Sequence, residues 1–382
     1  MVRVKVCIFV KFIFSVILIS AVFFETVYEI YAAGEISAKG FVVLEAKTGR
    51  IIFGQNEHEK LPMASTTKIM TAIIALEQGN INEYFEVSPE AVKTEGSSMG
   101  LKAGDKVSLY SLCCGMLLSS GNDAANAAAI HIAGSIDKFV DLMNEKAAEL
   151  GMKNTSFGSP SGLDIGEHYS TAYDMALLAR YAMQNEVFSS ICSEYELQVE
   201  FGNPPAKHTL TNHNKLLLWK DWIKGVKTGF TKKAGRCLVS YAEKDDVELI
   251  CVTLNCPDDW NTHKTVYEEW FDKLKVREIK VGEGLRADLI NGMQGYIEAE
   301  GETFKIALTD EEYANLEIKT YFERYKYAPV YEGEKLGYAK VSIGSEEILE
   351  FDLTAKETVS EKESVSMIII WFERLLKALF SI

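Results

Sequence analysis

The 382-residue chain contains only seven cysteines, seven prolines and six histidines, and it has no run of lysine and arginine. The cysteines show neither the paired spacing of a zinc site nor the density of a small disulfide-bonded domain. The formal net charge is −15 and no basic cluster is present. The sequence therefore lacks the concentrated positive charge that is typical of a nucleic-acid-binding protein. The histidines fall in no triad or metal spacing. We therefore expect no metal, no cofactor and no nucleic acid partner.

Most cysteines are predicted to be core residues. Cys113 and Cys114 have apolar neighbours, and the geometry of disulfides makes a bond between adjacent cysteines implausible. Cys251 and Cys256 are close in sequence, and a disulfide between them is an open alternative.

The first 33 residues differ from the rest of the chain. Arg3 and Lys5 precede an apolar stretch at 6–24, and Ala32 and Ala33 offer small residues for cleavage. This pattern predicts a secretory signal over 1–33. Because the apolar stretch is long for a signal peptide, a retained transmembrane helix is the alternative. In either case we expect the body of the chain on the extracytoplasmic side of the cell membrane.

Residues 34–275 alternate between strand and helix patterns and are expected to form one domain. We predict a β-hairpin from the strand patterns 41–44 and 51–53, and a helix opened by Pro62. Further helices are expected within 83–150, at 173–184 and at 260–274, with adjacent strands at 235–241 and 247–254.

The C-terminal part changes in character. Short strand patterns predict a small β domain over 276–354, with strands at 304–308, 328–331 and 337–341, followed by a charged linker at 355–366. Residues 367–382 have a helical period with large apolar residues over most of the surface. This segment is too short to span a bilayer comfortably, so we expect it to lie in the membrane interface. The alternative is a helix packed on its own protein.

A Ser-x-x-Lys motif at Ser65 and Lys68 lies near the start of a predicted apolar helix. Residues three apart on a helix share a face, so the two side chains can meet. A nucleophilic serine needs a base within hydrogen-bond reach, and burial would lower the pKa of Lys68 toward the neutral amine. The spacing alone is weak evidence, because Ser135 and Lys138 repeat it. Ser135 is better explained as the N-cap of the following helix.

Two further motifs favour Ser65. Ser120-Gly121-Asn122 places a hydroxyl and an amide on a predicted interhelical turn, and Lys227-Thr228-Gly229 begins a predicted extended segment. The small Gly229 would let a substrate lie beside the backbone as an added strand. Lys47-Thr48-Gly49 has the same sequence as the third motif, but it lies between two strand patterns and is predicted to be a hairpin turn. The ordered set is typical of penicillin-binding proteins and class A β-lactamases.

With these motifs, the chain resembles the low-molecular-mass penicillin-binding proteins that are serine-type D-Ala-D-Ala carboxypeptidases, peptidase family S11. The resemblance covers about residues 38–275 and is carried by the stretches 63–71, 118–125, 168–176, 225–231 and 234–238. It implies an α/β (α+β) penicillin-binding/β-lactamase-like transpeptidase domain, an antiparallel sheet with helices on both sides. A small all-β domain and an amphipathic tail helix would follow.

The resemblance also implies a reaction. Ser65 would attack the carbonyl between the two D-alanines of a peptidoglycan stem peptide, and Lys68 would accept its proton. Ser120 would relay a proton to the leaving amine. β-Lactams would acylate the same serine, and the C-terminal helix would hold the enzyme at the membrane surface.

Substrate binding is implied for the remaining motif residues. Asn122 would hold the substrate's amide, while Lys227 and Thr228 would bind the terminal carboxylate through a fixed charge and a hydroxyl. Next to Gly229, the backbone N–H of Phe230 would join that of the nucleophile in an oxyanion hole. Some family members have histidine in place of Phe230, so we expect an altered pocket shape with activity retained.

Rival functions are less well supported. A β-lactamase needs a base for the deacylating water, and no convincing Glu-x-x-x-Asn segment lies between Ser120 and Lys227. A transpeptidase or endopeptidase would differ in acceptor or in the bond attacked, which the sequence hardly encodes. Intact motifs argue against a catalytically silent penicillin-binding sensor. His168, near Asp164 and Asp174, is expected to make a structural hydrogen bond.

Overall fold

The computed structural model describes residues 36–282, 284–362, 371–372 and 375–376. The predicted secretory signal and most of the predicted tail helix lie outside these residues. In the described part of the chain, no helix has the length and apolar character needed to cross a membrane.

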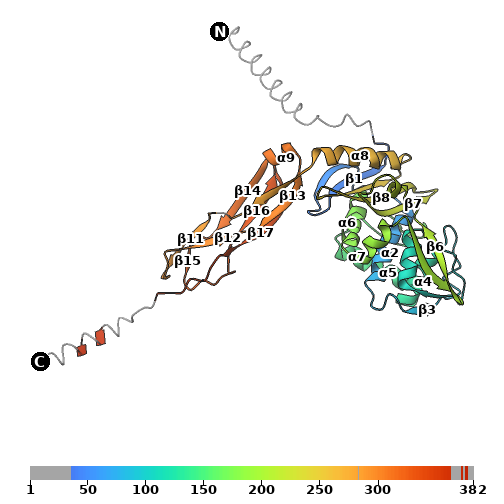
Figure 1. The fold of residues 1–382 in the computed structure, drawn as a ribbon, viewed down its shortest axis with the longest axis horizontal. Helices are drawn as coiled ribbons and strands as arrows, with labels where there is room; N and C mark the ends of the chain where they lie inside the picture. The colour runs from blue at the N-terminus through green and yellow to red at the C-terminus, as the bar shows by residue number, and fades with distance from the viewer. Residues whose placement is uncertain (1–35, 283, 363–370, 373–374, 377–382) are drawn as a thin grey trace, which may run out of the picture. The chain divides into compact units, whose positions relative to one another are not determined.

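A five-stranded antiparallel sheet of order β2-β1-β9-β8-β7 organises the larger domain (Figure 1). Its strands are β1 (Gly40–Glu45), β2 (Ile51–Gln55), β7 (Ile223–Thr231), β8 (Gly235–Lys244) and β9 (Val247–Leu254). The predicted hairpin and the two predicted adjacent strands are confirmed. Gly49 in the hairpin turn has φ 79°, a left-handed conformation that favours glycine, so Lys47-Thr48-Gly49 is a turn.

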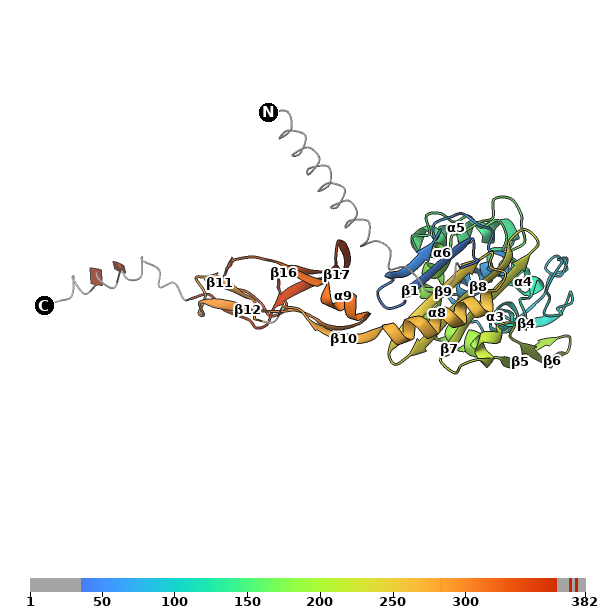
Figure 2. The same ribbon diagram turned by 90° about the horizontal axis from the view of Figure 1, so that it is seen from above.

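Helices cover both faces of this sheet (Figure 2). On one face, His263 of α8 (Asp259–Lys273) lies 2.6 Å from Ser240 Oγ and 2.9 Å from Thr253 Oγ1. On the other face, Val239 and Val252 join the large core formed with the remaining helices. Alternating side chains along each strand separate the two sets. This arrangement confirms the expected fold class.

The other helical elements supply that core and carry most of the predicted motifs. They are η1 (Ala64–Thr67), α2 (Lys68–Leu76), α3 (Leu109–Leu117), α4 (Asn122–Ala133), α5 (Ile136–Glu149), α6 (Ala172–Met183), α7 (Glu186–Ser193) and η2 (Lys215–Leu218). Ser135 caps α5 by accepting a hydrogen bond from the Lys138 N–H, as predicted.

Two helix predictions are wrong in detail. Pro62 does not open a helix, because Leu61 exchanges two backbone hydrogen bonds with Ser170 and holds the segment extended. Residues 83–108 are not helical either, since Gly96, Gly100 and Gly104 all have positive φ. This region instead supplies β3 (Tyr84–Glu86) and β4 (Lys106–Ser108), which form a second sheet with β5 (Glu196–Gly202) and β6 (Pro205–Thr211).

The C-terminal β domain has its own hydrophobic core, formed by residues between Ile279 and Val359. A two-stranded sheet pairs β10 with β13, and a six-stranded sheet has the order β14-β16-β17-β12-β11-β15. Its elements are β10 (Lys275–Lys280), β11 (Arg286–Ile290), β12 (Tyr296–Glu300), β13 (Thr303–Leu308), α9 (Asp310–Ala314), β14 (Leu316–Phe322), β15 (Tyr325–Tyr327), β16 (Lys335–Ile343) and β17 (Glu346–Ala355).

Two boundaries in this domain differ from prediction. The strand expected at 328–331 is only an isolated bridge between Val330 and Val359, because Pro329 has no N–H to extend a ladder. The expected linker does not begin at 355, since Val359 pairs with Val330 and the Lys362 N–H donates to Asn291 O. The chain therefore stays attached to the β domain up to Lys362.

Candidate active site

Ser65 and Lys68 meet at the junction of η1 and α2. Ser65 lies in the 3₁₀ turn and Lys68 is the first residue of the α-helix, which places Lys68 Nζ 3.0 Å from Ser65 Oγ. Ala64, just before the serine, has φ 49°, an uncommon conformation for a residue with a side chain. The helical pairing predicted from the Ser-x-x-Lys spacing is confirmed.

Lys68 is completely buried, and its amine has two neighbours besides Ser65. Lys68 Nζ donates to Asn122 Oδ1 at 2.7 Å and to the Ser161 carbonyl at 2.5 Å. Burial first, and then the nearby charge of Lys227, lower the pKa of Lys68 well below its ordinary value. The site therefore favours the neutral amine, which can accept a proton.

The second motif occupies the turn between α3 and α4. Ser120 has φ 60° and its side chain lines the cleft, and within the described part of the chain its hydroxyl has no hydrogen-bond partner. Asn122 is 4% exposed, and besides accepting from Lys68 it donates from Nδ2 to the Glu95 carbonyl at 2.6 Å. In this structure Asn122 orients Lys68; a contact with the substrate's amide stays a prediction.

Asp123 fixes the loop that brings Ser97 to the cleft. Its carboxylate accepts hydrogen bonds from the backbone N–H groups of Met99, Gly100 and Leu101 at 2.9, 3.1 and 3.0 Å, and from Ser98 Oγ at 2.6 Å. Four donors on one carboxylate hold the loop firmly against the start of α4.

The third motif lies within β7. A Cβ at Gly229 would come within 3.0 Å of the Met63 carbonyl and 3.1 Å of the Ser65 backbone N. Glycine is thus favoured because β7 passes close to the segment that carries Ser65. This packing is a more direct reason than the room for substrate that we predicted. Thr228 and Phe230 both line the cleft, and the Phe230 side chain is 66% exposed.

Lys227 differs from its expected role as a fixed charge. Its side chain is 1% exposed, and Nζ donates to the Thr228 carbonyl at 3.0 Å. Burial lowers the pKa of Lys227 to about 7. Its charge therefore changes within the physiological range of pH.

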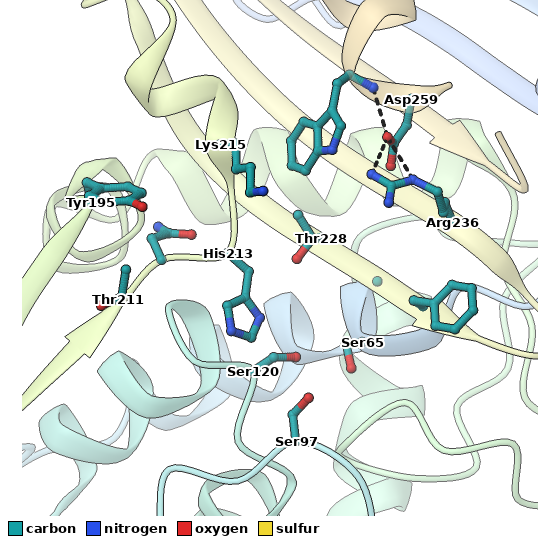
Figure 3. Close-up of a pocket in the computed structure, with 14 residues that line it drawn as sticks. Ser65, Ser97, Ser120, Tyr195, Thr211, His213, Lys215, Thr228, Arg236 and Asp259 are labelled. Carbon is teal, nitrogen blue, oxygen red and sulfur yellow. Dashed lines mark hydrogen bonds and ion pairs between the residues drawn. The ribbon is translucent and has the colours of Figure 1, made fainter. Parts of the chain in front are cut away.

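These elements enclose a cleft of about 520 Å³ (Figure 3). Ser65, Ser97 and Ser120 lie along one side, and Thr228 and Arg236 lie on the strands opposite. The other lining residues are Tyr195, Thr211, Asn212, His213, Lys215, Gly229, Phe230, Asp259 and Trp260.

Sequence reasoning gave no role to Arg236, although its stretch 234–238 belonged to the resemblance. Arg236 donates to Asp259 Oδ1 from Nε at 3.0 Å and from Nη2 at 2.6 Å, while its side chain stays 41% exposed in the cleft. A carboxylate that fixes one edge of a guanidinium leaves the remaining N–H donors for a ligand. Only the fold brings Arg236 of β8 into the same cleft as Thr228 of β7.

His168 supports the segment that carries Ser65 but is not among the residues that line the cleft. The Gly158 N–H donates to Nδ1 at 2.9 Å, so Nε2 carries the proton and donates to Thr67 Oγ1 at 2.9 Å. Thr67 Oγ1 in turn donates to the Ala64 carbonyl at 2.8 Å. Burial lowers the pKa of His168 to about 4, and the predicted structural hydrogen bond is confirmed.

The six cysteines within the described residues are buried, as predicted. Burial raises the pKa of Cys113 well above its ordinary value and that of Cys114 to about 12, so neither is a nucleophile. Cys251 is a free thiol and does not pair with Cys256. Within the described residues, no group of three or more histidine, cysteine and acidic side chains is arranged to hold a metal.

Comparison with known proteins decides the family. The peptidase S11 model, described as D-alanyl-D-alanine carboxypeptidase, matches residues 27–258. The chain belongs to the peptidase S11 family. A second model, the C-terminal domain of penicillin-binding protein 5, matches residues 299–361.

Individual relatives agree with this assignment. D-alanyl-D-alanine carboxypeptidase DacF of Bacillus subtilis is 33% identical over 338 residues, which are 85% of this chain and 86% of the relative. DacC of Escherichia coli is 37% identical over 240 residues, 59% of this chain and 58% of the relative. Penicillin-binding protein 5 of Haemophilus influenzae has a TM-score of 0.73 at 26% identity, covering 87% of this chain and 100% of its own.

The fold and the enzyme class follow from these matches. The S11 chain is a serine hydrolase of the D-alanyl-D-alanine carboxypeptidase type, with a penicillin-binding protein fold and a function in cell wall metabolism. The crystal structure of DacD from Francisella tularensis, with a TM-score of 0.67 at 28% identity, covers 87% of this chain and 96% of its own.

Proposed function

We propose that this S11 enzyme removes the terminal D-alanine of peptidoglycan pentapeptide stems through an acyl-enzyme on Ser65. The observation that carries the proposal is the environment of Lys68. A buried neutral amine has two N–H bonds and one lone pair. Its neighbours Asn122 Oδ1 and the Ser161 carbonyl can only accept, so they take both N–H bonds. The lone pair is left for the Ser65 hydroxyl, 3.0 Å away.

Acylation then follows from this arrangement. Ser65 Oγ attacks the carbonyl carbon of the penultimate D-alanine while its proton moves to Lys68 Nζ. Backbone N–H groups of Ser65 and Phe230 receive the developing oxyanion. When the C–N bond breaks, the Ser120 hydroxyl relays the proton from Lys68 to the leaving amine, and free D-alanine departs.

In deacylation Lys68 again acts as the base, now for a water molecule, and then returns the proton to Ser65. A water molecule attacks the ester carbonyl and gives its proton to the again neutral Lys68. The C–O bond to Ser65 breaks, Ser65 Oγ takes the proton back from Lys68, and the shortened peptide leaves as a carboxylic acid. A β-lactam would acylate Ser65 by the same first step.

Recognition of the terminal carboxylate is assigned to Thr228 and Arg236, with Lys227 in support. Arg236 presents a guanidinium that is exposed in the cleft, whereas Lys227 is buried with a pKa lowered to about 7. Bidentate contact of a guanidinium with a carboxylate would orient the scissile bond toward Ser65.

We also propose that the enzyme is exported and works at the extracytoplasmic face of the bacterial cell membrane. The predicted signal at 1–33 and the apolar segment at 367–382 support this location. Of the latter, Trp371, Phe372, Leu375 and Leu376 are exposed in the structure, as expected for a helix whose apolar side chains bind lipid.

The proposed reaction is tested by incubating wild type, Ser65→Ala and Ser135→Ala with a peptide ending in D-Ala-D-Ala and measuring released D-alanine. Ser135→Ala should keep full activity and Ser65→Ala should lose it. Penicillin labelling of the wild type without D-alanine release would instead indicate a sensor, and rapid turnover of penicillin would indicate a β-lactamase. For the location, a chain ending at Lys362 should float with vesicles far less than the full-length chain once its signal is removed.

A further inference from the structure

The C-terminal β domain exposes a sheet face that is rich in tyrosine. Strands β12, β11 and β15 lie side by side at the end of the six-stranded sheet (Figure 1). Asp288 of β11 pairs with Tyr296 on one side and with Tyr325 on the other, and Ile290 pairs with Tyr327. Paired residues share a face of the sheet. Ala287 and Leu289 point into the core, so this tyrosine-bearing face is the outer one.

The outer face changes in character along the strands. At one end, Arg286 and Glu298 form a cross-strand ion pair at 3.0 Å. Charged groups extend along the face as far as Asp288, which lies between Tyr296 and Tyr325, and the Arg286 guanidinium lies 4.5 Å from the centre of the Tyr296 ring. Beyond Asp288, toward the β11–β12 turn, the exposed side chains are apolar and aromatic. Exposed fractions there are 40% for Ile290, 65% for Met293, 61% for Tyr325 and 66% for Tyr327. Exposed side chains of this size gathered on one surface indicate a contact surface.

The point at which the chain leaves the β domain indicates which partner this surface contacts. The Met293 N–H donates to the Ser360 carbonyl at 2.9 Å, and the Lys362 N–H donates to Asn291 O at 2.8 Å. The chain thus leaves the β domain beside the β11–β12 turn. Only residues 363–366 separate this point from the apolar segment 367–382. Four fully extended residues reach about 14 Å, so a lipid-bound segment keeps the turn close to the bilayer surface.

We propose that the exposed face formed by Ile290, Met293, Tyr296, Tyr325 and Tyr327 is a second lipid-contact surface, resting in the headgroup region of the bilayer. The inference rests on the proposed membrane binding of the C-terminal segment. Tyrosine suits this region because its ring is apolar and its hydroxyl stays hydrated. Two contacts on one domain would fix the orientation of the β domain at the membrane, which a single point of attachment cannot do.

Hydrogen exchange of the full-length chain, with and without phosphatidylcholine–phosphatidylglycerol vesicles, tests the proposal directly. Backbone amides in 291–296 and 325–331 should become protected when vesicles are added. Vesicle flotation without this protection would overturn the second contact while leaving the tail anchor intact. Absence of flotation would contradict both. Protection that appears without lipid and grows with protein concentration would assign the face to a second copy of the chain.

Variants give an independent readout. The double variant Tyr325→Ser, Tyr327→Ser should weaken partitioning of the full-length chain into vesicles by about tenfold, the loss expected for about 1.4 kcal/mol of apolar contact. Met293→Glu, which places a charge on the turn, should weaken it similarly. The matched control is Tyr313→Ser, Tyr321→Ser, because these tyrosines are 47% and 46% exposed elsewhere in the same domain. The proposal would be overturned if the Tyr325→Ser, Tyr327→Ser variant and the control variant partitioned equally into vesicles.

Discussion

Replacing Asn122 by aspartate should protonate Lys68, the proposed base, at neutral pH. The substitution places a carboxylate where Asn122 Oδ1 now lies, 2.7 Å from Lys68 Nζ. An opposite charge at this distance favours the ammonium form by about 6 kcal/mol at the effective dielectric constant of protein sites. Part of this gain is offset by burying the carboxylate. Since 1.36 kcal/mol is one pKa unit, the neutral fraction of Lys68 should fall by about two orders of magnitude.

The assay is the second-order rate of acylation by a fluorescent penicillin as a function of pH. Asn122→Asp should acylate about 100-fold more slowly near pH 7 and recover as the pH rises through the elevated pKa of Lys68. Asn122→Ala removes only the acceptor and should cost about tenfold with little change in the pH profile. Asn126→Asp, one turn further along α4, is the matched control and should leave the profile unchanged. A wild-type profile for Asn122→Asp would refute the assignment of Lys68 as a base whose neutrality Asn122 helps to maintain.

Three further predictions concern recognition, packing and stability. Arg236→Gln should raise KM at least tenfold for a peptide with a free C-terminal carboxylate, while the variant folds normally. Steady-state kinetics check this, because the KM for the matching peptide amide should be the same in the variant and the wild type. Gly229→Ala should slow acylation and lower stability by about 1–3 kcal/mol, because its Cβ would displace the segment of Ser65; a denaturant titration and penicillin labelling measure both, and wild-type values would contradict the reading. Burial lowers the pKa of His168 to about 4 and of His263 to about 3, below the 6.5 of an unfolded chain. Stability present above pH 6.5 should therefore be lost progressively as the pH falls toward 4, seen as a falling Tm, and a flat Tm over this range would argue against neutral buried histidines.

The active-site motifs could be found from sequence because each combines a local geometry with a chemical requirement. Ser65 and Lys68 are three residues apart across the junction of η1 and α2, and Ser135 could be set aside as an N-cap on local grounds alone. Gly229 was also selected, although its physical reason is the contact between β7 and the η1 segment, which no local pattern encodes.

Other parts of the site depend on tertiary packing. Arg236 belongs to β8 and meets Asp259 at the start of α8, and only strand pairing sets it opposite Phe230, two residues along β7 from Thr228. The buried state of Lys227, which makes its charge depend on pH, is likewise invisible in a Lys-Thr-Gly string. In the loop at 87–105, glycines with positive φ overrode an apparent helical pattern.

The attachment of residues 356–362 to the β domain was also missed. Their charge and polarity favour a linker, yet Val359 is buried and pairs with Val330. One buried valine among charged residues is a weak signal. Its consequence is large, because it sets where the chain leaves the domain and how far the terminal segment can reach.

Peptide mapping of the penicillin-labelled enzyme tests the central claim most directly. The chain is labelled briefly, digested and analysed by mass spectrometry, with Ser65→Ala and Ser135→Ala treated in parallel. The account predicts one penicillin per chain, attached to the peptide that contains Ser65, retained in Ser135→Ala and absent from Ser65→Ala. An adduct on any other serine, or undiminished labelling of Ser65→Ala, would contradict it.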